Sequence, residues 1–238
     1  MKAMILAAGL GTRLKPFTDK YPKALAIVNG KSLLQRNIEY LSSFGIKDVI
    51  VNVHHFARQI KDVIEKNNGF GSNITISDES DEVLETGGGL MKAKHFFSQK
   101  ESFILMNVDV LTNMNLRIMI KQHNSLKPLA TLAVTGRKTT RYFLFDDVGN
   151  LCGWKNKKTG EQKISKESKK YFEKAFSGIH IISPEIFSLI KRKGKFSMVD
   201  VYLDLAKSHT ITAFDHSTSK FIDVGKPESI KIAGEIFP

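Results

Sequence analysis

Cysteine is almost absent from this chain, because Cys152 is the only one among 238 residues. A single cysteine forms no intramolecular disulfide, and no Cys/His cluster has zinc-site spacing, so we expect a reducing, cytoplasmic environment. Long apolar runs are lacking too. The run 3–8 is far shorter than the roughly 20 residues of a membrane span, and a glycine-bearing stretch interrupts it at once. We therefore expect no membrane span and no signal peptide.

Acidic residues are fewer than basic ones, with 24 Asp plus Glu against 36 Lys plus Arg and a formal charge of +12. Such a charge favours a polyanionic partner, which is either a nucleic acid or a small phosphorylated substrate. The densest basic stretch, 155–174, also holds glutamates and few aromatic residues. It is typical of a solvated, mobile surface segment. We expect no nucleic-acid partner, and salt-sensitive oligonucleotide binding would test this alternative.

Apolar periodicity predicts the fold. Strand-like runs at 3–8, 49–53, 74–77, 103–108 and 130–134 alternate with amphipathic helical stretches at 32–45, 56–67, 90–97 and 116–123. After residue 135 we expect a hairpin of 142–145 with 151–154, strands at 175–182, 211–214 and 221–224, and helices from 183 and over 199–207. This order predicts an α/β fold, a mixed, mostly parallel sheet covered by helices on both faces. No linker interrupts the chain, so we expect one domain, 1–238.

The strand over 3–8 leads directly into Gly9-Leu10-Gly11-Thr12-Arg13. Ligands of open α/β sheets bind at the carboxyl ends of strands, and glycines let backbone N–H groups approach phosphate oxygens. A guanidinium such as that of Arg13 suits bidentate phosphate binding. The loop has neither the Rossmann nor the Walker spacing, so on its own it is equally typical of an ordinary tight turn. Asp109 and Asp223 follow predicted strands, where aspartates also cap loops and helices.

Taken together with Pro16 and Pro22-Lys23, this loop resembles the signature of the sugar-phosphate nucleotidyltransferases. Further parts of that pattern are matched by Asn107-Val108-Asp109, Phe176-Ser177-Gly178-Ile179-His180 and Asp223-Val224-Gly225-Lys226-Pro227-Glu228. The resemblance implies a Rossmann-like, GT-A-like domain with a nucleotide-binding half, 1–135, and a sugar-phosphate-binding half, 136–238. It also implies that the protein joins a nucleoside triphosphate to a sugar 1-phosphate and releases pyrophosphate.

The resemblance implies catalytic roles for Arg13, Lys23, Asp109 and Asp223. Asp109 and Asp223 would hold Mg²⁺, the one implied cofactor, through hard carboxylate oxygens. Arg13 would bind the leaving pyrophosphate, and Lys23 would lie between the two reacting phosphates. The implied nucleotide contacts are Ala7, Ala8, Gly9, Gly11, Thr12, Arg13, Lys23, Thr86, Gly87 and Gly88. The glycines of the run Gly87 to Gly89 would expose their backbone to the edge of the base. The implied sugar-phosphate contacts are Asn107 and Gly178.

Within that family, Leu84-Glu85-Thr86-Gly87-Gly88-Gly89 most resembles the uridylyltransferases that act on N-acetylmuramate 1-phosphate in cell-wall recycling. This favours UTP and an N-acetylmuramate 1-phosphate-like sugar. Guanylyl transfer to mannose or heptose 1-phosphate, cytidylyl transfer to phosphocholine, and a non-catalytic nucleotide-binding regulator stay open. The oligomeric state is expected to be a monomer or small homo-oligomer.

Two positions depart from the family pattern. Val108 stands where a glycine is usual, and we expect its branched side chain to narrow the sugar pocket. A central Glu-Lys-Pro motif, whose lysine holds the sugar phosphate in many members, is missing. Glu173-Lys174-Ala175 is the one candidate substitute.

Overall fold

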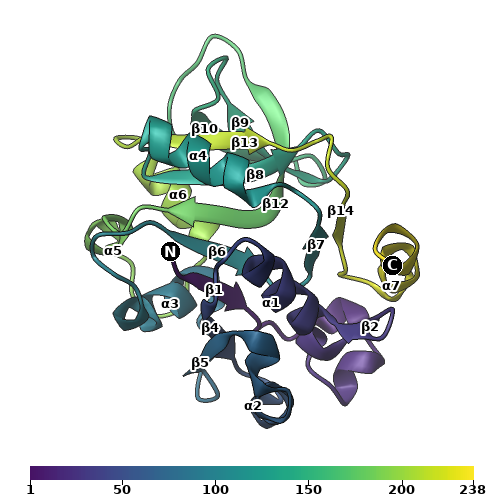
Figure 1. The fold of residues 1–238 in the computed structure, drawn as a ribbon. Helices are drawn as coiled ribbons and strands as arrows, with labels where there is room; N and C mark the ends of the chain where they lie inside the picture. Colours follow the sequence, from purple (N-terminus) through teal and green to yellow (C-terminus); the bar gives the residue numbers. More distant parts are fainter.

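The computed structural model describes residues 1–238 and has a mixed ten-stranded sheet at its centre (Figure 1). The strand order is β11-β10-β9-β12-β6-β1-β4-β5, and β8 lies between β12 and β13. The parallel part consists of β1 (Ala3–Leu6), β4 (Asp48–Val53), β5 (Asn73–Asp78) and β6 (Phe103–Asn107). The remaining strands are β8 (Ala130–Thr135), β9 (Arg141–Phe145), β10 (Leu151–Asn156), β11 (Gln162–Ile164), β12 (Phe172–Ile182) and β13 (Ile211–Asp215). β12 is antiparallel to β6, β8 and β9, so the parallel order of the first four strands ends at the β6–β12 pair, and β13 then pairs with β8 in parallel.

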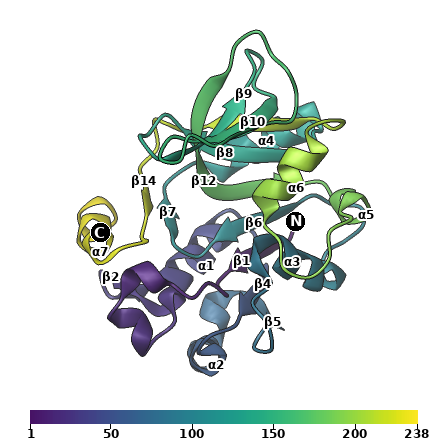
Figure 2. The same ribbon diagram turned by 180° about the vertical axis from the view of Figure 1, so that it is seen from behind.

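Helices cover both faces of this sheet, which confirms the expected α/β fold. One face carries α1 (Leu33–Ser43), α2 (Ala57–Lys66) and α4 (Leu116–Leu126), and the other carries α3 (Glu85–Lys92), α5 (Ile186–Leu189) and α6 (Met198–Leu205) (Figures 1 and 2). Successive residues of β1 supply opposite cores, since Ile5 packs with the first group and Met4 with the second. Burial on both faces explains why β1 is apolar throughout.

Local signals place several element ends where the sequence predicts them. The Ser32 hydroxyl accepts a hydrogen bond from the Gln35 N–H at 3.1 Å and caps α1. Gly45, with φ +82°, follows the end of the same helix. The expected start of a helix at residue 90 is wrong, because α3 begins at Glu85 and a 3₁₀ turn, Lys94–Phe96, follows it. Tight packing overrides the low helix propensity of the glycines in its first turns.

A third, smaller core joins the two ends of the chain. The C-terminal helix α7 (Pro227–Ile236) lies beside the segment that follows β1, and both views show this contact (Figures 1 and 2). Two short ladders complete the fold: β2 (Ile27–Val28) with β3 (Lys31–Ser32), and β7 (Val110–Thr112) with β14 (Phe221–Asp223). The β7–β14 ladder pairs the segment before α7 with the segment that follows β6.

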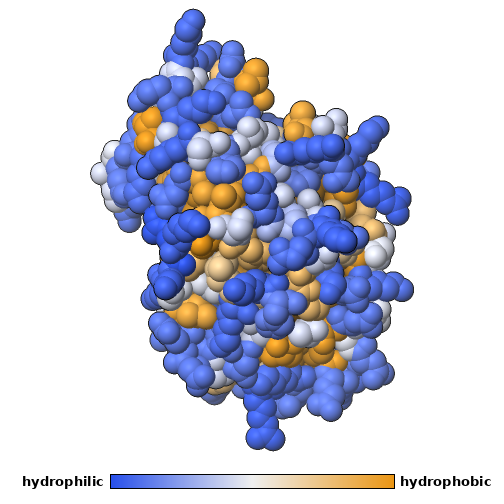
Figure 3. Space-filling view, turned by 90° about the vertical axis from the view of Figure 1, so that its left-hand side faces the viewer, coloured by the Kyte–Doolittle hydropathy of each residue, from blue (hydrophilic) through white to orange (hydrophobic).

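One face of the molecule is largely polar (Figure 3). On the face seen in Figure 3, hydrophilic residues dominate and apolar residues show through in several groups. The basic stretch 155–174 contains β11, whose residues are all exposed. No helix has both the length and the apolar character needed to cross a bilayer.

Candidate active site

The carboxyl ends of β1, β4 and β6 open into a cavity of about 420 Å³. A second cavity, of about 240 Å³, shares Asn107 with it. Residues expected from the sequence line both spaces. The first holds Ala7, Ala8, Gly9, Gly11, Thr12, Arg13, Lys23, Thr86, Asn107 and Asp109, and the second holds Asn107, Gly178 and Asp223. Folding thus gathers nearly the whole predicted set around two adjoining spaces at one edge of the sheet, as the strand-end rule predicts.

Gly11 shapes the loop that follows β1. Its φ is +63°, and its carbonyl accepts a hydrogen bond from the Thr18 hydroxyl at 3.0 Å. A Cβ added at this position would lie 2.9 Å from Thr18 Cγ2 and 3.0 Å from Lys23 Cβ. Only glycine fits this backbone and this contact. The loop therefore folds back against the 3₁₀ turn Lys23–Leu25 and carries the Lys23 side chain to the cavity.

Lys23 forms an ion pair with Asp109, and both side chains are largely buried, at 11% and 18% exposed. The end of β6 that presents Asp109 is fixed by two hydrogen bonds. The Val108 N–H donates to the Leu6 carbonyl at 3.1 Å, and Asn37 Nδ2 donates to the Val108 carbonyl at 2.7 Å. A low-dielectric environment strengthens the Lys23–Asp109 attraction and holds the ammonium at the junction of the two cavities.

Asp223 reaches the same place from the other end of the chain. In the β7–β14 ladder it lies opposite Val110, and the next residue, Val224, donates its N–H to the Asp109 carbonyl at 2.8 Å. Loss of hydration in the cleft raises the pKa of Asp223, and the negative charge of Asp109 raises it further. Lys23 and Arg13 act in the opposite direction. Two carboxylates forced together in this way favour a bound cation.

The donor set fits Mg²⁺. Two carboxylates supply hard oxygen ligands, and no cluster of three or more His, Cys, Asp or Glu side chains surrounds a single point in the molecule. Mg²⁺ commonly binds through one or two carboxylates together with substrate phosphates and water, whereas a structural zinc site needs about four protein ligands. The arrangement of Asp109 and Asp223 therefore suits a cation that arrives with a phosphorylated substrate.

Arg13 lies at the exposed rim of the first cavity. A Cβ on Gly225 would lie 3.0 Å from Arg13 Nη2 and 2.8 Å from Asp223 Oδ1, so the Gly225 backbone contacts both side chains. Arg13 is thus close to Asp223 and acts to lower its pKa, but the two side chains form no ion pair. Its planar guanidinium faces solvent and the cavity, where it can bind a phosphate chain through two N–H groups.

Gly87 and Gly88, which the sequence predicts at the base edge, pack against a segment that is distant in the chain. Both lie inside α3, outside the cavity lining, and both N–H groups donate to the Phe196 carbonyl, at 2.9 and 3.3 Å. A Cβ on Gly87 would lie 2.5 Å from the Phe196 ring, and one on Gly88 would lie 2.3 Å from the Gly194 carbonyl oxygen. These glycines let α3 pack closely on the 194–196 segment. Thr86 does line the cavity, and its hydroxyl accepts the Met198 N–H at 2.8 Å.

Asn52 is a cavity residue that the sequence interpretation missed. Its Oδ1 accepts the Ala7 N–H at 2.7 Å, and its Nδ2 donates to Oε1 of Glu79 at 2.8 Å. Glu79 is fully buried, and burial raises its pKa. The pair fixes the backbone at the start of the loop that follows β1. One sequence signal was available, since a lone asparagine between Val51 and Val53 is unusual in a fully buried strand.

Gly178 brings β12 against the end of β6. Its φ is +72°, and an added Cβ would lie 2.7 Å from Asn107 Nδ2 and 2.9 Å from Val110 Cγ2. It lies where the β12–β8 register shifts, between Phe176 and His180. This close approach places the Asn107 side chain between the two cavities.

The two departures from the family pattern also have structural outcomes. Val108 lines the first cavity and does not line the second. Glu173 pairs with Lys157 at 2.5 Å, and Lys174 pairs with Asp215 at 2.5 Å. Neither residue lines the second cavity. Glu173-Lys174 therefore does not replace the missing Glu-Lys-Pro motif.

Comparison with known proteins identifies the class that this fold and site define. A model of the nucleotidyl transferase family matches residues 2–234, and the chain belongs to that family. It is 28% identical over 242 residues to the N-acetylmuramate alpha-1-phosphate uridylyltransferase of Caulobacter vibrioides, covering 98% of this chain and 95% of that protein. It is also 28% identical over 241 residues to the UTP–glucose-1-phosphate uridylyltransferase of Synechocystis sp., covering 95% of this chain but only 60% of the length of that relative.

A solved structure agrees with this assignment. HddC from Yersinia pseudotuberculosis, complexed with GMP-PN, superimposes with a TM-score of 0.79 at 26% sequence identity. The match covers 100% of this chain and 99% of that one. The family and the fold expected from the sequence are therefore both confirmed.

Proposed function

We propose that this protein transfers a nucleotidyl group from a nucleoside triphosphate to a sugar 1-phosphate and releases pyrophosphate. One observation carries the proposal: Asp109, Asp223 and Lys23 meet where the two cavities share Asn107. A triphosphate in the first cavity and a phosphorylated acceptor in the second would present their phosphates to this point. Membership of the nucleotidyl transferase family supports it.

The nucleotide occupies the first cavity in this proposal. Backbone N–H groups of the 7–13 loop and the Arg13 guanidinium bind the β- and γ-phosphates, and this charge neutralisation stabilises the departing pyrophosphate. Asn52 keeps the loop in place by accepting the Ala7 N–H. The protein thus performs its work mainly by positioning and by electrostatics, as is general for phosphoryl and nucleotidyl transfer.

Asp109 and Asp223 would hold Mg²⁺, which neutralises charge on the α-phosphate when it is bound. An oxygen of the sugar phosphate attacks the α-phosphorus, the bond from that phosphorus to the bridging oxygen of the β-phosphate breaks, and that oxygen leaves with pyrophosphate. The attacking oxygen is already ionised, so no general base is required. Lys23 offsets the repulsion between the two anions that must approach each other.

We further propose UTP and an N-acetylmuramate 1-phosphate-like sugar as the substrates. The Caulobacter relative with that name matches over nearly the full length of both chains. Guanylyl transfer is the second candidate, because the similar Yersinia structure carries GMP-PN. In this proposal 1–135 and 136–238 are functional halves of one domain, and Ser197 and Gly225 of the second half also line the first cavity.

The test is pyrophosphate release with Mg²⁺. Each of the four ribonucleoside triphosphates and dTTP is paired with N-acetylmuramate, mannose, heptose and glucose 1-phosphates and with phosphocholine. We expect release from UTP with N-acetylmuramate 1-phosphate and none from the Asp109→Asn variant. Release from another pair would correct the substrates and keep the activity. No release from any pair, with retained triphosphate binding, would favour the non-catalytic regulator.

A further inference from the structure

The second cavity is lined by a positively charged side chain, Arg137, to which the sequence assigned no role. Arg137 follows β8 and lines this space together with Asn107, Gly178, Asp223 and a second, exposed arginine, Arg141. A sugar phosphate in this cavity would carry its negative charge beside the Asp223 carboxylate, so an additional cation is needed there. Lys174 does not supply it, because that ammonium is engaged by Asp215.

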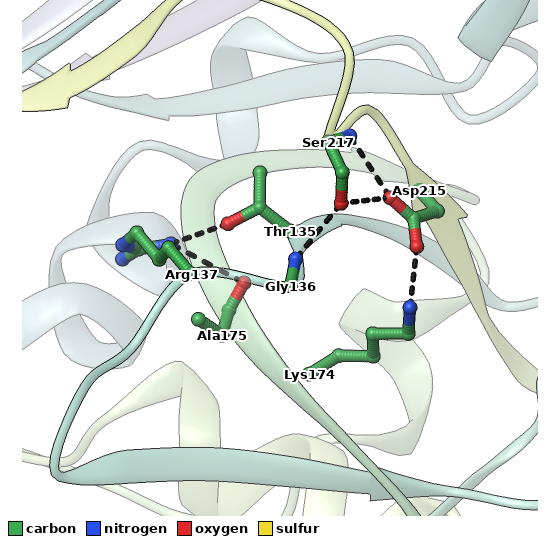
Figure 4. Close-up of polar contacts among 7 residues, drawn as sticks. All are labelled: Thr135, Gly136, Arg137, Lys174, Ala175, Asp215 and Ser217. Atoms are coloured by element: carbon green, nitrogen blue, oxygen red, sulfur yellow. Dashed lines mark hydrogen bonds and ion pairs between the residues drawn. The ribbon is translucent and has the colours of Figure 1, made fainter.

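Neutral groups hold the Arg137 guanidinium in place. Its Nη1 donates to the Thr135 hydroxyl at 3.1 Å and to the Ala175 carbonyl at 3.4 Å (Figure 4). Its Nη2 donates to the Phe176 carbonyl at 2.8 Å. The guanidinium also lies over the Phe221 ring, 4.6 Å from its centroid. An arginine has five N–H groups, so the Nε–H and one Nη2 N–H are left over from these three hydrogen bonds.

The backbone beside Arg137 is anchored from the opposite side. The Gly136 N–H donates to the Ser217 hydroxyl at 2.8 Å, and that hydroxyl donates to Asp215 at 2.5 Å (Figure 4). The Asp215 carboxylate also accepts a hydrogen bond from the Lys174 ammonium at 2.5 Å. In Figure 4 the Arg137 side chain extends away from the Lys174–Asp215 pair. One network thus neutralises Lys174 and fixes the backbone from which Arg137 extends toward the cavity.

Arg137 has no anionic partner of its own. It is half-buried, and burial lowers its pKa, yet it forms no ion pair with any carboxylate. A partly desolvated cation held only by neutral acceptors is unfavourable until an anion joins it. The negative charge of Asp223 acts on Arg137, which places the guanidinium near the reaction centre. A phosphate that reaches Asp223 is therefore within the field of Arg137.

We propose that Arg137 binds the phosphate of the sugar 1-phosphate. This inference rests on the proposed function and names the residue that supplies the cation missing with the Glu-Lys-Pro motif. The free N–H groups of its planar guanidinium suit phosphate oxygens. The contacts to Thr135, Ala175 and Phe176 orient the guanidinium before substrate arrives, which reduces the entropy lost on binding.

The test compares Arg137→Met with Arg117→Met. Arg117 is an exposed arginine that lies over a phenylalanine ring, that of Phe44, and lines neither cavity. For Arg137→Met we expect the KM for the sugar 1-phosphate to rise about 10- to 100-fold, the range for loss of a charge-assisted hydrogen bond. The KM for the nucleoside triphosphate is expected to stay within about twofold of the wild-type value, because Arg137 does not line the first cavity. Arg117→Met is expected to change neither constant.

Arg137→Lys separates a binding role from a purely structural one. The lysine keeps the charge but lacks the planar, two-pronged donor geometry of a guanidinium, so a binding role predicts a KM for the sugar phosphate between those of the wild type and Arg137→Met. The inference would be overturned if the KM values for both substrates rose equally, or if the KM for the sugar phosphate were unchanged in either folded variant. Turnover by the wild type would still support the proposed function in that case. If Arg137→Met does not fold, the lysine variant alone decides. A wild-type protein that is inactive with every pair would overturn the proposed function and this inference with it.

Discussion

Asp223 lies beside Asp109 because the residue that follows it donates its N–H to the Asp109 carbonyl at 2.8 Å. The β7–β14 ladder thus holds two like charges together, and it does so at the junction of the two cavities. Lost hydration and, after it, repulsion by Asp109 raise the pKa of Asp223. The folded structure keeps these two carboxylates together despite their repulsion, an arrangement that is typical of sites that bind a cation.

Replacing either aspartate tests the cation site. We expect Asp109→Asn and Asp223→Asn each to lower pyrophosphate release at least about 100-fold, because a neutral amide is a weak ligand for Mg²⁺. Circular dichroism and thermal unfolding would confirm that the fold persists. Asp147→Asn, an exposed change in the β9–β10 turn, is the control and is expected to be silent. Wild-type rates with Mg²⁺ in either variant would remove that aspartate from the site.

Arg13→Lys tests phosphate binding at the rim of the first cavity. A lysine keeps the positive charge but replaces a planar donor pair by a point charge, so we expect a roughly tenfold loss in kcat/KM for the triphosphate. The matched control is Arg58→Lys, whose side chain is 93% exposed. Steady-state kinetics with varied triphosphate would measure the effect. Unchanged affinity and rate in the Arg13 variant would contradict the assigned role.

Gly178→Ala tests the close contact between β12 and β6. The added Cβ would meet Asn107 Nδ2 at 2.7 Å and Val110 Cγ2 at 2.9 Å, at a φ of +72°. Gly149→Ala has a similar φ of +84° but open space around the Cβ, so its cost is the backbone conformation alone, about 1–2 kcal/mol. We expect Gly178→Ala to unfold at a lower temperature than Gly149→Ala. It should also raise the KM for the sugar phosphate, whereas Gly149→Ala should not. Identical behaviour of the two variants would show that the contact is unimportant.

Three buried histidines predict acid sensitivity. Burial disfavours the charged imidazolium and lowers the pKa of His123 and His216 to about 4 and that of His180 to about 3. The unfolded chain binds protons with a pKa near 6.5, so it binds more protons than the folded chain between these values. Stability therefore falls as the pH drops below about 6.5, by up to about 1.4 kcal/mol per pH unit for each histidine.

Thermal unfolding at pH 7, 6 and 5 would measure this dependence. His123→Gln should be less pH-sensitive than the wild type, even if it is less stable at pH 7, because one titrating group is gone. The exposed His55 provides the control, and His55→Gln should leave the slope unchanged. An unfolding temperature independent of pH over this range would contradict the prediction.

Local sequence determined much of this protein. Apolar runs with two different periods specified the strands and helices, and Ser32 and Gly45 marked the ends of α1. The loop from Gly9 to Arg13 follows directly from its position after a buried strand. These features depend on residues close together in the chain, so the sequence alone predicts them.

Tertiary structure decided which candidate residues face the cavities. Gly87 and Gly88 have the composition of a binding loop, yet close contact with the 194–196 segment places them in a helix. Lys174 has the charge expected of a sugar-phosphate ligand, but Asp215 neutralises it, while Arg137 faces the second cavity. Each of these outcomes depends on a partner far away in the sequence. Local propensity contains no information about such partners, because packing and charge pairing between distant segments select them only when the whole chain folds.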